Sequence, residues 1–219
     1  MNRAPSPDPR PRGFIVPAIG LVLAAIGFGR AFRGPPERFW DRMTTNGAVL
    51  GTFALVSAPD LARPRLRFWD LPLGVAFATA LYGVFAIGDR AARRVMPSGA
   101  REIEEIYALR GGRPASEIAT RLALVIAPAE EMFWRGMLQG VLMRWLGRWR
   151  GAAVTNVGYA GVHVATGNLT LIGAAGTAGA FWSALHAAGA PLGSLIVSHV
   201  AWDVWIFLVK PTSRPAAEG

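Results

Sequence analysis

Uncharged apolar stretches alternate with short polar segments over most of the chain. The first runs from 13 to 29, behind residues 1–12, which are rich in Pro and Arg and are expected to be a disordered tail. A helix needs about 20 apolar residues to cross a bilayer, and a helix satisfies its own backbone there. The pattern predicts an all-α, polytopic transmembrane bundle of six to eight helices. The other low-charge runs are 44–62, 71–88, 122–143, 151–166, 169–186 and 191–209.

The first apolar run also has the length and the basic flank of a signal peptide. Residues 30–36, which follow it, contain no convincing small-x-small cleavage pattern. We therefore interpret residues 13–29 as a retained membrane helix.

The polar stretch between 89 and 121 interrupts the apolar pattern. Within it, Ile103, Ile106, Tyr107 and Arg110 recur at helical spacing, which predicts an amphipathic helix at the membrane interface or a helix in an exposed loop. We divide the chain into a tail (1–12), N-terminal membrane helices with the interfacial segment (13–120), a C-terminal helical core (121–209) and a second disordered tail (210–219).

Tryptophan and glycine positions fit the same interpretation. Five tryptophans lie near run ends, where an interfacial belt would place them: Trp40, Trp69, Trp145, Trp149 and Trp182. Glycines within the runs allow helices to approach closely; they include Gly47, Gly51, Gly173 and Gly179.

Composition narrows the function classes. The chain has no cysteine, which excludes disulfides, thiolate metal sites and a cysteine nucleophile. The net charge of +9 arises from basic residues that fall mainly between apolar runs, a placement typical of contact with lipid head groups and not of nucleic-acid binding. Arginine greatly outnumbers lysine, which indicates GC-rich coding and favours a bacterial source. Together with the apolar runs, this predicts a multi-pass protein of a bacterial plasma (inner) membrane.

Six ionisable residues lie inside apolar runs of the C-terminal core. A charge at the bilayer centre costs at least about 2.5–3.5 kcal/mol, so such groups usually face the bundle interior and mark a functional site. The six are Glu130, Glu131, Arg135, His163, His199 and Asp203.

Their spacing along the helices separates the two glutamates. Glu131 and Arg135 are four residues apart and can form a buried ion pair on one helix face. Glu130 is offset by about 100° and remains free for chemistry. His199 and Asp203 also share a face. Pro128 removes a backbone donor just before the glutamates and can loosen the helix there.

These residue types fit water activation. A carboxylate in a low-dielectric pocket can act as a general base, and imidazoles can bind a metal or donate to an oxyanion. Two histidines and a carboxylate also match a catalytic zinc site. The residues taken singly have other interpretations: a structural ion pair, a hydrogen bond between helices, or a proton relay in a transporter.

Three motifs in this core resemble the CPBP intramembrane peptidase family, which includes the type II CAAX prenyl endopeptidases and bacterial proteins linked to bacteriocin processing and self-immunity. The first, EExxxR, is Glu130-Glu131-Met132-Phe133-Trp134-Arg135. The second, FxxxH, is Tyr159-Ala160-Gly161-Val162-His163, and the last, Hxxx(N/D), is His199-Val200-Ala201-Trp202-Asp203. The resemblance spans about residues 122 to 208 and makes 121–209 the catalytic core.

The resemblance implies a role for each residue. Glu130 would activate water, Glu131 would be held by Arg135, and His163 would bind the water or a metal. His199 and Asp203 would stabilise the oxyanion or complete the coordination. Asp203 stands where Asn is common, and an ionised Asp cannot donate to an oxyanion, which favours a metal site. The resemblance leaves open a metal-free glutamate mechanism and a metalloprotease. In a metalloprotease the ligands for Zn²⁺ would be Glu130, His163, His199 and Asp203.

The partners expected from this resemblance are membrane lipid and a peptide or protein substrate, lipid-modified in the prenyl endopeptidases, with no nucleic acid. Two other functions stay open. The chain could be a non-catalytic scaffold or immunity protein that binds a partner through its helices. It could also be a proton-coupled transporter, in which case Asp203 would carry the proton.

Overall fold

The computed structural model describes residues 10–95 and 99–209, so residues 1–9 of the tail predicted at 1–12 and the whole tail predicted at 210–219 lie outside this described part. Every regular element within it is helical, which confirms the predicted all-α class. The elements are α1 (Arg10–Phe32), η1 (Pro36–Arg38), α2 (Phe39–Ser57), α3 (Pro59–Ala62), α4 (Asp70–Val95), α5 (Gly99–Ala108), α6 (Ala115–Arg121), η2 (Leu122–Ile126), α7 (Ala127–Glu131), η3 (Met132–Gln139), α8 (Gly140–Leu146), α9 (Arg148–His163), η4 (Val164–Thr166), α10 (Leu169–Ala188), α11 (Leu192–Val204) and η5 (Trp205–Val209).

Two predicted boundaries are wrong. Helix α1 begins at Arg10, so residues 10–12, assigned to the tail, continue the helix. The run predicted at 44–62 divides into α2 and α3, because Ala58 leaves helical geometry with φ −149° and ψ 65°. Pro59, whose missing N–H suits the first turn of a helix, then begins α3.

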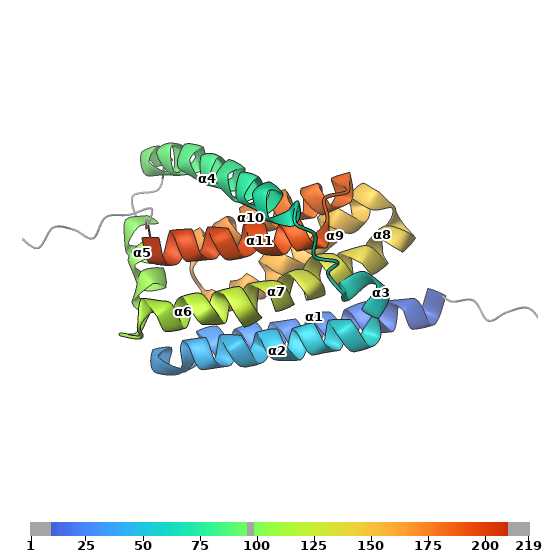
Figure 1. Cartoon of the computed structure of the whole chain (residues 1–219). Helices are drawn as coiled ribbons and strands as arrows, with labels where there is room; N and C mark the ends of the chain where they lie inside the picture. The colour runs from blue at the N-terminus through green and yellow to red at the C-terminus, as the bar shows by residue number, and fades with distance from the viewer. Residues whose placement is uncertain (1–9, 96–98, 210–219) are drawn as a thin grey trace, which may run out of the picture.

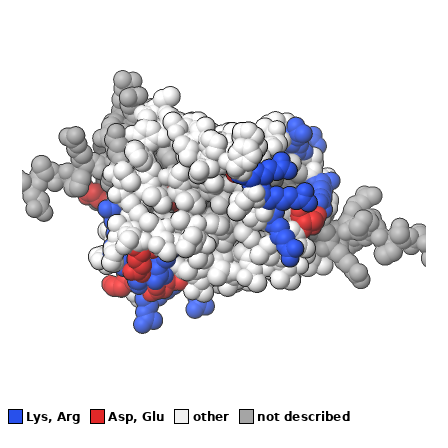
Figure 2. All heavy atoms as spheres, in the orientation of Figure 1, with Lys and Arg blue, Asp and Glu red and all other residues white. Residues whose placement is uncertain are grey.

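Long helices run side by side along the bundle (Figure 1), and the segment from α6 to η3 passes between the pair α1 and α2 and the pair α4 and α11. Three helices of the described part are long and apolar enough to cross a membrane: Phe14–Phe32, Asp70–Gly88 and Leu192–Val209. The face in Figure 2 carries its charged side chains towards the two ends, with a broad uncharged band between them. This distribution is that of a bundle embedded in lipid.

Helix α2 packs closely against α7 through two small residues. A Cβ at Gly51 would lie 2.9 Å from the Cβ of Ala129, and one at Gly47 would lie 3.4 Å from the Cα of Ile126. The glycines therefore let α2 approach the helix that carries the paired glutamates.

Helix α5 lies across one end of the bundle (Figure 1) and is amphipathic, as predicted: Ile103 and Ile106 are partly buried, whereas Glu104 is exposed. The Glu102 carboxylate accepts the backbone N–H of Thr170 at 2.7 Å, at the start of α10. A carboxylate stabilises a helix N-terminus, so α5 is attached to the bundle and is not a free loop helix.

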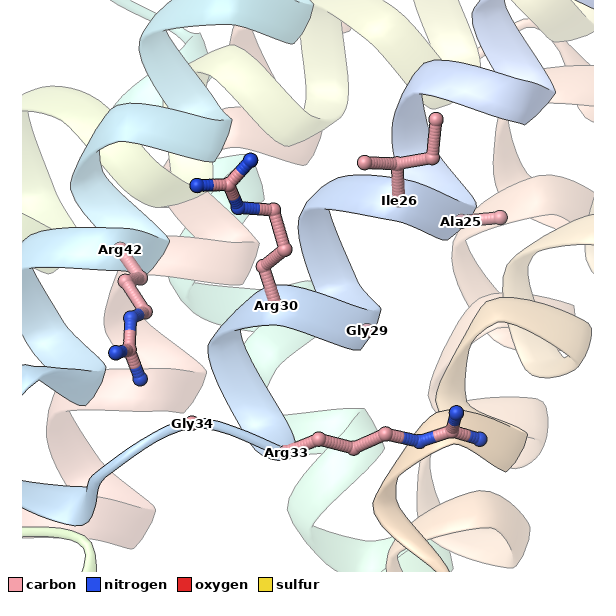
Figure 3. A pocket seen from close by; sticks show the side chains of 7 residues that line it. All are labelled: Ala25, Ile26, Gly29, Arg30, Arg33, Gly34 and Arg42. Carbon is pink, nitrogen blue, oxygen red and sulfur yellow. The ribbon is translucent and has the colours of Figure 1, made fainter.

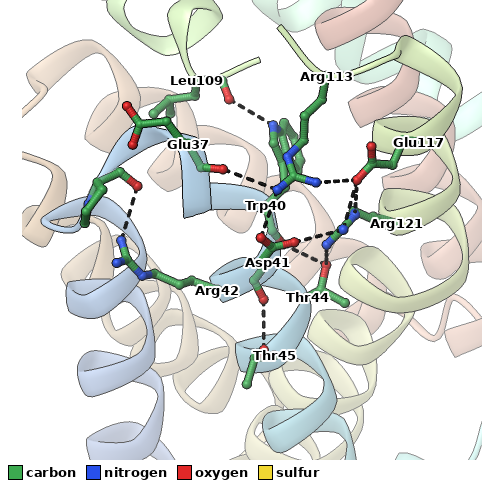
Figure 4. Close-up of polar contacts among 11 residues, drawn as sticks. Glu37, Trp40, Asp41, Arg42, Thr44, Thr45, Leu109, Arg113, Glu117 and Arg121 are labelled. Carbon is green, nitrogen blue, oxygen red and sulfur yellow. Dashed lines mark hydrogen bonds and ion pairs between the residues drawn. The ribbon is translucent and has the colours of Figure 1, made fainter. Parts of the chain in front are cut away.

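A cluster of charged residues joins the beginnings of α2 and α6 (Figure 4). Arg113 and Arg121 both bind the Asp41 carboxylate, at 2.8 and 2.9 Å, and both also bind Glu117. The Trp40 indole beside them donates to the carbonyl of Leu109 at 2.9 Å. These contacts hold the beginning of α6 against the beginning of α2.

The substitution Glu117→Gln tests this cluster. Hydrogen bonding to Arg113 holds the pKa of Glu117 below its ordinary value of 4.5. A carboxyl whose folded pKa is depressed stabilises the fold above its unfolded pKa, and that contribution is lost as the pH falls through the lower folded value. Because the pair is exposed, we expect the variant to lower Tm by only about 1–3 °C at pH 7, with the difference vanishing in acid.

The measurement is the Tm of the purified protein in a neutral detergent between pH 7 and pH 3. Glu104→Gln, at an exposed glutamate of α5, is the control and should change Tm at no pH. A Glu117→Gln deficit that stays constant down to pH 3 would contradict this account.

Candidate active site

The six predicted residues come from three helical segments, and local distortion of the first presents its glutamates. Helix α7 carries Glu130 and Glu131 and lies between two π-helical segments, η2 and η3. Pro128 has no N–H to give to the preceding turn, so the helix adjusts around it. π-Helical segments widen a helix and are frequent at functional sites.

Glu131 and Arg135 form the buried ion pair that their spacing predicted. Arg135 Nη1 lies 2.9 Å from Glu131 Oε1, and both side chains are 0 % exposed. The same carboxylate oxygen lies 2.8 Å from Nδ1 of His199 on α11, so one carboxylate links two helices. The second oxygen, Oε2, is buried and has no hydrogen-bond partner among the described residues.

The Arg135 guanidinium is enclosed by aromatic rings and a backbone carbonyl. It lies 4.8 Å from the ring centre of Tyr159 and 5.3 Å from that of Trp182, both in the range of cation–π contacts. Its Nη2 donates to the carbonyl of Gly179 at 3.3 Å. One turn further, Gln139 donates to the carbonyl of Ser183 at 2.8 Å, so α10 is attached to η3 at two successive turns.

His199 lies between two carboxylates. Its Nδ1 faces Glu131, and its Nε2 lies 3.4 Å from Asp203 Oδ2. The imidazole stacks on Trp182, with ring centres 4.2 Å apart, and the Trp182 indole donates to Ser198 at 3.0 Å. Carboxylates accept hydrogen bonds, so this environment favours an imidazole that donates from both nitrogens.

His163 lies at the end of α9, and its own helix orients the ring. Its Nδ1 lies 2.8 Å from the carbonyl of Tyr159; a carbonyl only accepts, so Nδ1 carries the proton. The ring packs against Phe28 and Tyr159 at 4.8 and 4.9 Å between ring centres. In the neutral imidazole, Nε2 therefore offers a lone pair.

Glu130 differs from its neighbour. It is 4 % exposed, and no group in the described part of the chain donates a hydrogen bond to its carboxylate. Glu130 interacts electrostatically with His199, Asp203, Glu131 and Arg135, which are all members of the predicted site. The two adjacent glutamates thus have different surroundings: one oxygen of Glu131 contacts both Arg135 and His199, whereas Glu130 has no hydrogen-bond partner among the described residues.

The described residues give the expected zinc centre no support. Both nitrogens of His199 face carboxylates, so an imidazole that donates from both has no lone pair for a metal, whereas Nε2 of His163 keeps one. Within the described residues, no group of three or more His, Asp and Glu side chains is placed to hold a metal ion. A metalloprotease is therefore not supported.

Several residues of the site were missed by the sequence analysis. Trp182 was assigned to an interfacial belt but is buried against Arg135 and His199, and Trp40 is buried too. Trp182 stands well inside its helix, three residues after Gly179, and that position was the available signal. Phe28 could not be recognised, because its contact with His163 spans most of the chain.

Residues 116–205 match the family model described as Type II CAAX prenyl endopeptidase Rce1-like. This segment, which is less than half of the chain, is similar to the Rce1-like domain. The match confirms the resemblance to the CPBP family over this part of the chain, and it covers all six predicted residues. No curated protein and no solved structure is significantly similar to the chain. At the level of the family, the Rce1-like domain supports a membrane-embedded peptidase related to CAAX proteases.

The close approach of α10 to α9 gives a test of the geometry. A Cβ at Gly179 would lie 2.6 Å from Cδ1 of Tyr159, whose ring covers Arg135, and would also overlap Asn156. We expect Gly179→Ala to push α10 away and to lower Tm by about 5 °C or more, because overpacking a core costs about 1–3 kcal/mol.

Gly173→Ala is the matched control, because that glycine lies on the same helix and its Cβ would meet nothing within 4 Å. It should keep or raise the Tm, since alanine favours a helix over glycine. Equal Tm values for the two variants, measured by intrinsic fluorescence in detergent, would refute the packing described.

Proposed function

We propose that the Rce1-like domain is an intramembrane endopeptidase in which Glu130 is the general base that activates the hydrolytic water. One observation carries the proposal: Glu131 is neutralised by Arg135 and His199, whereas Glu130 beside it has no partner among the described residues. A buried carboxylate without a partner can accept a proton, which a carboxylate in an ion pair does poorly.

The reaction follows from these positions. Glu130 takes a proton from water, and the oxygen attacks the carbonyl carbon of the scissile peptide bond to give a tetrahedral oxyanion. Glu130 then gives that proton to the amide nitrogen as the C–N bond breaks, so that an acid and an amine leave. The carboxylate is regenerated, and the overall reaction consumes one water per bond cut.

The two histidines have complementary parts in this proposal. Nε2 of His163 accepts a hydrogen bond from the water, because Nδ1 is committed to Tyr159. Nε2 of His199 lies 3.4 Å from Asp203 Oδ2, an ion-pair contact longer than an ordinary hydrogen bond, and would be available to donate to the oxyanion. In this proposal Asp203 orients His199. The oxyanion then receives its hydrogen bond from His199 and not from Asp203, which as an ionised aspartate cannot donate one.

The mechanism proposed here uses no metal, and zinc stays a prediction that a chelator assay tests. Under the glutamate mechanism, incubation with 1,10-phenanthroline leaves the rate unchanged. A loss of activity that Zn²⁺ restores would assign the water to a metal ion instead.

For the substrate, we infer a peptide that reaches the domain from the surrounding membrane. The site lies on helices that pack in a largely apolar bundle, and the family that residues 116–205 match is described as a CAAX prenyl endopeptidase family. We propose that the protein lies in a bacterial plasma membrane. A lipid-modified or otherwise apolar peptide could reach the site from that membrane.

Peptide hydrolysis by the purified chain in lipid nanodiscs tests the function. The probes are quenched fluorescent peptides, with and without a farnesylated cysteine near the carboxyl end. We expect Glu130→Gln to lower kcat/KM about 10³-fold and His163→Ala about 10²-fold, the range for loss of acid–base groups.

Glu104→Gln, which removes the same charge from the exposed face of α5, should keep the full rate. A wild-type protein that cleaves no probe, or a Glu130→Gln variant that cleaves as well as wild type, would reject the peptidase and favour a non-catalytic scaffold or immunity role.

The chain of groups Glu131, His199 and Asp203 favours one second candidate, proton transfer in a transporter. That function predicts proton-coupled uptake in proteoliposomes that is lost in Asp203→Asn, with no cleaved product.

A further inference from the structure

An open pocket of about 550 Å³ lies at the end of α1, where the chain turns towards α2 (Figure 3). It is outside the candidate active site. Its polar wall consists of three arginines, two from the end of α1 and one from the first turn of α2. Its apolar wall comes from the last turns of α1. The lining includes Ala25, Ile26, Gly29, Arg30, Arg33 and Arg42.

The three arginines have no carboxylate partner in the described part of the chain. Arg33 donates to the carbonyl of Ala165 at 3.4 Å, and Arg42 donates to that of Pro35 at 3.3 Å. Arg30 makes no hydrogen bond or ion pair there. The nearby Asp41 is already bound by Arg113 and Arg121 (Figure 4), so it does not compensate the pocket.

Gly34 positions Arg42 at the pocket. A Cβ at Gly34 would overlap the guanidinium of Arg42, so this glycine lets the charged group lie directly over the backbone of the turn. The three guanidinium groups line the pocket from different sides, with that of Arg33 turned towards Ala165 (Figure 3), and each can bind a phosphate through two N–H groups.

The surface next to the pocket is apolar and faces outward. Ile15, Ile19, Val22 and Ile26 lie on one face of α1 and are each about half exposed. Their spacing of four, three and four residues forms a continuous stripe along a helix able to cross a membrane. The stripe ends at Ile26, which also lines the pocket.

A phospholipid combines the two groups that such a surface would bind: a phosphate for the arginines and a hydrocarbon chain for the stripe. We propose that the pocket binds the phosphate head group of an anionic membrane phospholipid, whose acyl chain lies along the exposed stripe of α1. Charge complementarity selects an anionic lipid over a zwitterionic one, and the stripe selects a lipid over free phosphate.

The test measures binding of dioleoyl phosphatidylglycerol to the purified full chain in neutral detergent, by native mass spectrometry and by the shift in Tm. The pocket variant carries Arg30→Gln, Arg33→Gln and Arg42→Gln. The control carries Arg63→Gln, Arg65→Gln and Arg67→Gln, which removes the same charge from exposed positions at the opposite end of the bundle.

We expect phosphatidylglycerol to raise the Tm of the wild type and of the control, and the pocket variant to bind it at least about 10-fold more weakly. Arg30→Gln alone, which removes no described contact, should weaken binding about 3-fold with an unchanged Tm in the absence of lipid. This single variant keeps the test valid if the triple variant fails to fold.

Three results would overturn the proposal. The first is equal affinity of wild type and Arg30→Gln for phosphatidylglycerol. The second is equal binding of dioleoyl phosphatidylcholine, which would exclude recognition of head-group charge. The third is inorganic phosphate that binds as well as the lipid and displaces it, which would assign the pocket to a free anion.

Discussion

The buried charge of Glu131 is the constraint on which the rest of the catalytic core depends. A carboxylate removed from water must be compensated, and here one oxygen is shared by Arg135 from its own helix and His199 from α11. Compensation of Arg135 in turn requires the carbonyl of Gly179 and the rings of Tyr159 and Trp182. Segments far apart in the sequence are thereby fixed around one point, and Glu130 is left beside it without a partner.

The two adjacent glutamates have different parts in this arrangement: Glu131 is held in place, and Glu130 is proposed to react. Glu131 cannot move without losing its contacts with Arg135 and His199, whereas Glu130, one residue earlier, makes no hydrogen bond among the described residues. The π-helical segments on both sides of α7 and the absent donor of Pro128 give this short helix its own geometry inside a longer one. Close packing of Gly51 on Ala129 holds that geometry against α2.

The sequence predicted the parts of the site that depend on spacing within one helix. The Glu131–Arg135 pair and the proximity of His199 and Asp203 follow from four-residue spacing, and the all-α class follows from the apolar runs. Contacts between helices were not predictable: the pairing of Glu131 with His199 and the burial of Trp182 depend on helix rotation and depth, which periodicity leaves undetermined. The zinc ligands were predicted from residue types and from the family resemblance, neither of which determines where the ring nitrogens point, and both nitrogens of His199 face carboxylates.

The most direct test of the central claim is a double-mutant cycle on the unfolding free energy, with Arg135→Met, Glu131→Gln and the two combined, measured by reversible unfolding in mixed micelles. If Glu131 is the charge around which the core is built, Arg135→Met alone should destabilise by about 3–5 kcal/mol, because it leaves Glu131 without its main cation. Neutralising Glu131 in the same protein should then recover at least about 2 kcal/mol of that loss. Additive effects, with no recovery in the double variant, would contradict the account.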